Sequence, residues 1–272
     1  MQGLNRSHIE KAFDAYVAGY DAADEKIRLK AEHTYKVAAL CDMIAGSLGL
    51  PEAERDVAWL AGMLHDIGRF EQVRRWDTFY DSQSVNHAEF GADLLFRDGL
   101  IWRFVGEGAG AVDPALEQDE GAAPCSVDPA LEPAIRNHNR LRVEDGLPAR
   151  TRMFADILRD ADKIDIIRVN VESPVTEIYN APIDEIRASA ITPEVEAGFY
   201  RHRCIDSRLK RTVADRMVGH FAFVFELVYP ASIAEVKRQG HLWQAMGFEF
   251  TNPDTAAKVA AMRDEMRAWL GE

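Results

Sequence analysis

The stretch Leu60-Ala-Gly-Met-Leu-His-Asp-Ile-Gly-Arg69 joins a run of apolar residues to an adjacent histidine and aspartate. Apolar residues recur at three- and four-residue spacing, at Val57, Leu60, Ala61 and Leu64, and this period predicts a helix packed into a core. Gly68 is a suitable residue for ending that helix. The segment therefore predicts a buried helix whose last turn carries His65 and Asp66.

Asp66 is the residue of this segment that is costly to bury. The C-terminal end of a helix carries partial negative charge, and an unpaired carboxylate loses its hydration when it is buried. A positive partner is therefore expected, and Arg69 is one candidate. A metal ion bound jointly by His65 and Asp66 is the other candidate, and this segment alone leaves both open.

Four of the other helices that this apolar period predicts each have one ionisable residue on the apolar side. These residues are His33 in 24–45, His87 in 85–96, His138 in the segment that follows Asp128, and Asp162 in 152–169. No run of alternating polar and apolar residues predicts a set of strands, so the predicted fold class is all-α.

Length and composition bound the domain organisation. A chain of 272 residues forms one large domain or two small ones. The ionisable residues named above all lie in 1–170, which also contains a segment rich in Gly, Ala, Asp, Glu and Pro at about 106–126 that is expected to be an exposed insert. Residues 69–84 lack a clear period and are expected to form a loop or short turns. Residues 171–272 keep a helical pattern and are expected to be a C-terminal helical extension of the same globule.

Charge and cysteine content restrict the partners and the compartment. The formal net charge of -13 argues against a duplex nucleic acid as partner, whereas a small phosphorylated substrate stays compatible because a bound metal changes the local charge. Cys41, Cys125 and Cys204 show no paired spacing, and no secretory leader is recognised, so a reducing, cytoplasmic location is expected. No apolar run reaches the roughly 18 residues that span a bilayer, so no membrane association is expected.

The ionisable residues on apolar faces form a set that is difficult to explain one by one. Each histidine alone is compatible with an ordinary core residue, and each aspartate with an ion pair. Together they are expected to share a partner, because buried ionisable groups are costly. Imidazole and carboxylate ligands favour Fe, Mn, Zn or Ni, whereas Mg prefers oxygen ligands. The candidate metal ligands are His33, His65, Asp66, His87, His138 and Asp162.

The order of these residues resembles the HD-domain superfamily of metal-dependent phosphohydrolases. The similarity covers about residues 25–168 and includes the words Leu64-His-Asp-Ile-Gly68 and Arg159-Asp-Ala-Asp-Lys163. His87 and His138 match the additional histidines of the two-metal branch of that superfamily. The resemblance implies an HD-domain-like helical bundle with extra C-terminal helices packed on it.

The resemblance also implies a division of the ligands between two ions. One ion would be held by His33, His65, Asp66 and Asp162, and Asp66 would bridge to a second ion held by His87 and His138. The implied reaction is hydrolysis of a phosphate ester in a nucleotide, a dinucleotide or a small phosphomonoester, with a metal-activated water. Arg69 and Lys163 are candidate phosphate contacts, although both could instead hold Asp66 or Asp162 in place.

Two other functions remain compatible with the same residues. The ligand set also resembles the diiron oxygenases of the HD superfamily, in which the site activates dioxygen. A signalling or scaffold module with a purely structural metal site is the third possibility. Metal analysis, phosphate release and dependence on oxygen would discriminate among the three.

Overall fold

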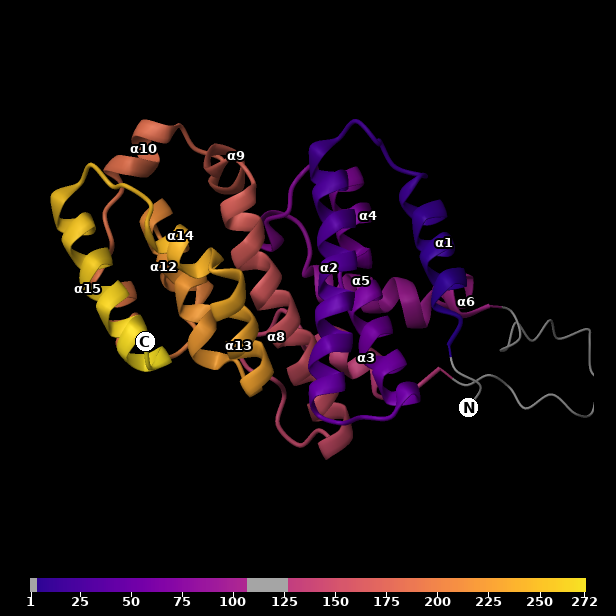
Figure 1. Ribbon diagram of the computed structural model, residues 1–272. Coiled ribbons are helices and arrows are strands. Elements are labelled where there is room, and N and C mark those ends of the chain that lie inside the picture. Colours follow the sequence, from indigo (N-terminus) through magenta and orange to yellow (C-terminus); the bar gives the residue numbers. More distant parts are fainter. Residues whose placement is uncertain (1–3, 107–126) are drawn as a thin grey trace, which may run out of the picture. The chain divides into compact units, whose positions relative to one another are not determined.

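The computed structural model describes residues 4–106 and 127–272. Within these ranges the chain is helical and contains no strand, so the predicted all-α class is confirmed (Figure 1). The chain divides into two compact units, Met1–Leu158 and Arg159–Glu272, and the boundary lies within helix α8 (Ala149–Glu172). The domain boundary near residue 170 stays a prediction. The insert predicted at about 106–126 lies, apart from Gly106, outside the described residues.

The first unit is built around two long helices that pack along each other, α2 (Glu25–Ser47) and α3 (Glu52–Leu64) (Figure 1). A Cβ at Gly62 would lie 2.6 Å from Ala38 Cα, so the glycine permits this close approach. The other helices of the unit are α1 (Arg6–Val17), α4 (Ile67–Trp76), η1 (Asp81–Gln83), α5 (His87–Ala92), the π-helical η2 (Asp93–Arg97), α6 (Ile101–Val105) and α7 (Leu131–Asn137).

The helix predicted to end at Gly68 ends earlier than expected. α3 stops at Leu64, and Asp66, with φ -102° and ψ 15°, separates it from α4. Gly68 lies in the first turn of α4 and ends no helix. A Cβ there would lie 2.7 Å from His87 O and 2.8 Å from Gly91 N, so this glycine lets α4 approach α5. The expected loop at 69–84 is accordingly wrong for the residues of α4.

The second unit contains the remaining helices, most of which are short, and side chains cap the start of two of them. Thr212 and Asp215 form a reciprocal capping box at the start of α12, and the Asn252 side chain caps α15. Its elements after α8 are α9 (Val175–Tyr179), α10 (Ile183–Ala188), α11 (Pro193–Phe199), η3 (Ser207–Leu209), α12 (Val213–Phe221), η4 (Ala222–Glu226), α13 (Pro230–Gln239), α14 (His241–Met246) and α15 (Pro253–Leu270). Among the helices of the described ranges, none is both long and apolar enough to cross a bilayer.

Candidate metal centre

The turn between α3 and α4 is where predicted ligands from separate helices meet. Asp66 is buried in this turn, directly after His65. Imidazole nitrogens from three other helices face its carboxylate: His33 of α2, His87 at the start of α5, and His138 directly after α7. The break between α3 and α4 therefore places Asp66 among histidines that are far apart in the sequence.

The ligand atoms form two groups that share Asp66. His33, His65 and Asp66 make one group, and Asp66, His87 and His138 make the other, with the ligand atoms of each group within 4.8 Å of one another. His33 Nε2 and His65 Nε2 lie 3.6 and 3.5 Å from Asp66 Oδ2. His87 Nε2 and His138 Nε2 lie 3.5 and 3.6 Å from Asp66 Oδ1. Each carboxylate oxygen thus faces its own pair of imidazoles.

The second ring nitrogen of three of these histidines is fixed by an oxygen acceptor. His65 Nδ1 lies 2.8 Å from Gly62 O, and His138 Nδ1 lies 2.7 Å from Ile135 O. A carbonyl oxygen accepts only, so each Nδ1 carries the proton and each Nε2 carries a lone pair. His87 Nδ1 likewise donates to Asp81 Oδ2 at 2.7 Å. The lone pairs needed for coordination therefore face Asp66.

Asp66 is held in its ionised form. Burial by itself would raise the pKa of the carboxyl group, but the positive charge of Lys30 outweighs burial and holds that pKa well below its usual range. Lys30 Nζ lies 2.6 Å from Asp66 Oδ2. The Asp66 carboxylate therefore stays available as a ligand at neutral pH.

Asp81, just before α5, organises one side of the site. Its carboxylate accepts hydrogen bonds from His87 Nδ1, from Arg69 Nη1 at 2.9 Å and from Asn139 Nδ2 at 3.2 Å. Burial alone would raise the pKa of Asp81, but His87 and Arg69 lower it to about 2. Burial lowers the pKa of His87 to about 3, and the positive charge of Arg69 adds to that effect. His87 is therefore neutral at pH 7, as a metal ligand must be.

The donor set fits divalent transition metals. Histidines that bind metals usually donate their other N–H to a carbonyl or carboxylate oxygen, as His65, His87 and His138 do here. His87 Nε2 and His138 Nε2 lie 3.0 Å apart, which suits two donors that share one ion with bonds of about 2.1 Å. The chemistry of imidazole and carboxylate ligands favours Fe, Mn, Zn or Ni.

The contacts of Arg69 are with groups of the protein itself. Its Nη1 donates to Gln72 Oε1, to Phe79 O and to Asp81 Oδ1, and its Nε lies 3.7 Å from Asp66 Oδ1. The guanidinium group therefore holds Asp81 and Asp66 in position, which is the second of the two roles considered for it. Its side chain is 14% exposed, so direct contact with a bound molecule stays a prediction.

Asp162 and Lys163 lie beyond the unit boundary, on the part of α8 that belongs to the second unit. Asp162 is half-buried, and Lys163 is buried with Nζ 3.8 Å from Glu226 Oε2. Their roles as a metal ligand and a phosphate contact remain predictions.

Two residues of the site were missed at the level of the sequence. Lys30 lies three residues before His33 and therefore on the same side of α2, a spacing that could have revealed it. Asp81 precedes His87 by six residues in a non-periodic segment, and no sequence signal marks it. Only the fold of that segment brings the Asp81 carboxylate to the imidazole.

The family comparison agrees with this geometry. A family model described as HD domain matches residues 31–167, half of the chain, and this range includes every predicted ligand. No significant match was found among curated proteins or among solved structures.

Proposed function

Because this chain belongs to the HD domain family, we propose that it is a phosphohydrolase that cleaves a phosphate ester with two divalent metal ions. The family consists mostly of metal-dependent hydrolases. The observation that carries the proposal is the pair of three-residue groups that share the Asp66 carboxylate. A carboxylate with an imidazole pair at each oxygen could supply a ligand to each of two ions, and pairs of ions are used to cleave phosphate esters.

The chain supplies the ligands and their orientation. His65, Asp66, His87 and His138 would hold the cations, with His33 completing the first group, while Asp81 and the two backbone carbonyls fix the ring tautomers. Bound ions at such a site supply a water of lowered pKa and offset the negative charge of a phosphoryl group. The site therefore needs no strong protein base to work near neutral pH.

Positive side chains beside Asp66 favour a small phosphorylated substrate. Lys30 Nζ and the Arg69 guanidinium group both lie 5.6 Å from the centre of the Phe79 ring. Both side chains also contact Asp66, so two cations lie next to the metal ligands although the net charge of the chain is -13. We infer that Lys30, which is 18% exposed, binds a phosphate oxygen of the substrate.

The test combines metal analysis with a substrate panel. Elemental analysis of freshly purified protein is expected to give two transition-metal ions per chain, and phosphate release is expected from at least one nucleotide, dinucleotide or phosphomonoester. Asp66→Ala is expected to lose both metals and the turnover. Asp42→Asn is the matched control, because Asp42 pairs with Arg6 and Arg55 in the same unit and belongs to neither ligand group.

Each of the two other functions has its own outcome in this test. Product formation that requires oxygen and releases no phosphate would indicate that the protein is an oxygenase and not a hydrolase. Bound metal with no turnover across the panel would favour a structural or signalling role. Full activity in Asp66→Ala would contradict the metal site itself.

A further inference from the structure

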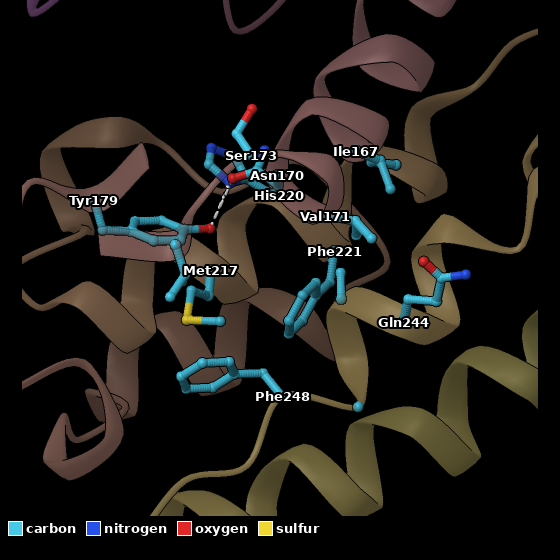
Figure 2. A pocket seen from close by; sticks show the side chains of 13 residues that line it. Ile167, Asn170, Val171, Ser173, Tyr179, Met217, His220, Phe221, Gln244 and Phe248 are labelled. Carbon is cyan, nitrogen blue, oxygen red and sulfur yellow. Dashed lines mark hydrogen bonds between the residues drawn. The ribbon is translucent and has the colours of Figure 1, made fainter. Parts of the chain in front are cut away.

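The second unit contains a cavity that the metal chemistry does not use. It has a volume of about 260 Å³ and is lined by residues of α8, α9, α12 and α14 and of the connecting segments (Figure 2). Its walls are largely apolar, with Ile167, Val171, Met217, Phe221 and Phe248 among them. Among the described residues that line it there is no Asp, Glu, Lys or Arg. A charged molecule would therefore lose hydration there without gaining an oppositely charged partner.

Three polar side chains at this cavity form a hydrogen-bond chain with a defined direction. Asn170 Nδ2 donates to Ile166 O at 2.7 Å, which turns Asn170 Oδ1 toward Tyr179. The Tyr179 hydroxyl donates its only proton to that oxygen at 3.0 Å. The hydroxyl must then accept from His220 Nδ1, which lies 3.0 Å away (Figure 2). The proton of the His220 ring therefore lies on Nδ1.

The environment of His220 keeps its ring neutral. Burial lowers the pKa of His220 to about 3, and the charges of Lys210 and Arg216 lower it further in the same direction. A neutral ring protonated at Nδ1 has an acceptor at Nε2. Within the described parts of the chain, the Tyr179 hydroxyl is the only hydrogen-bond partner of this ring. The cavity thus combines largely apolar walls with a neutral histidine ring, and Ser173 and Gln244 are further polar side chains in its lining.

We propose that this cavity binds a small uncharged organic molecule that has a flat apolar body and one N–H or O–H donor, which His220 Nε2 accepts. The size fits such a molecule, because a dry protein cavity of about 150 Å³ already accommodates benzene. The walls offer the side chains of Phe221 and Phe248 to an aromatic ring. Lys210 and Arg216 disfavour a cationic ligand.

The test compares two probes of the same shape on the full-length chain. Indole has the N–H donor, whereas benzofuran replaces it by an oxygen atom. Calorimetry is expected to show that indole binds about tenfold tighter, because benzofuran leaves the His220 acceptor without a partner. Failure of indole to bind, or equal affinities for the two probes, would overturn the proposal.

Two variants locate the binding to the cavity. His220→Leu is expected to bind both probes with similar affinity, because the acceptor is gone and the apolar walls remain. Met217→Trp is expected to lose both probes, since its larger ring fills the cavity. A preference for indole that persists in His220→Leu would place the binding elsewhere and overturn the assignment. If either variant fails to fold, the comparison of indole with benzofuran on the wild-type protein still tests the proposal.

Discussion

His87 in the first unit and His220 in the second are similar in their chemistry and different in what surrounds them. The pKa of each is lowered to about 3, and each has its Nδ1 fixed by an oxygen atom. His87 Nε2 faces the ionised Asp66, whereas His220 lines a cavity without charged residues. A neutral imidazole therefore becomes a candidate metal ligand or an acceptor for an uncharged molecule according to whether a carboxylate lies opposite Nε2.

The largest effect is expected from removing metal, which should affect the candidate metal centre and leave the His220 cavity unchanged. Chelation is expected to reduce phosphate release to the background of the assay and to destabilise the protein by about 4 kcal/mol for each ion that is present at 1,000 times its Kd. The melting temperature and phosphate release measure both effects. Indole affinity is expected to change less than about twofold, because no residue that lines the His220 cavity is a predicted ligand. Unchanged activity and stability would contradict the metal site.

Gly68→Ala tests whether the approach of α4 to α5 builds the second ligand group. The added Cβ would lie under 3 Å from backbone atoms of His87 and Gly91, and such overpacking typically costs about 1–3 kcal/mol. The variant is expected to melt at lower temperature and to hold one ion fewer per chain.

Gly46→Ala is the control for Gly68→Ala. Its Cβ would meet only the flexible Arg55 side chain, at 3.5 Å, so the variant is expected to be as stable as the natural protein or up to about 1 kcal/mol more stable. Two bound ions in Gly68→Ala would refute the proposed role of this contact.

Asp81→Asn tests the hydrogen bond at His87 Nδ1, the ring nitrogen that faces away from Asp66. The amide oxygen can still accept from His87 Nδ1, but the negative charge that strengthens the imidazole as a ligand is lost. Metal affinity is expected to fall about 10–100-fold, measured by competition with a chromogenic chelator. Asp98→Asn removes an exposed partner of Arg97 and should leave the affinity unchanged.

Lys30→Gln tests the positive charge next to Asp66. Loss of a charge-assisted contact to phosphate is expected to raise KM about tenfold, with metal content unchanged. Lys26→Gln is the control, because Lys26 lies on the same helix and pairs with the exposed Asp77. An unchanged KM would leave Lys30 as a partner of Asp66 alone.

The smallest effect is expected from pH at the His220 cavity. For an ordinary histidine, with a pKa near 6.5, the fraction of the neutral ring that can accept a hydrogen bond would fall about tenfold between pH 7 and pH 5.5. Because the pKa of His220 is lowered to about 3, its neutral form dominates above that pH, and indole affinity is expected to stay constant from pH 5 to pH 8. Weaker binding on acidification through pH 6 would show that Lys210, Arg216 and burial do not keep the ring neutral.

The sequence predicted most of the candidate ligands but not the residues that orient them. Ionisable residues on apolar faces single out His33, His65, His87 and His138, because few buried positions tolerate such groups without a partner. The same pattern cannot identify Asp81, which acts through His87 from a segment without a period. The cavity in the second unit was not predicted either, because its polar chain joins Tyr179 to His220, which lies 41 residues further along the sequence.

The all-α class and most of the candidate ligands were determined by the sequence alone, because helical period and the cost of burying ionisable groups are local properties. The tertiary structure decided where α3 ends, why residue 68 is a glycine, and which cation lies beside Asp66. These features depend on backbone and side chains brought together from distant parts of the chain. Local spacing cannot specify such contacts, because it fixes which side of a helix a residue occupies and not what packs against that side.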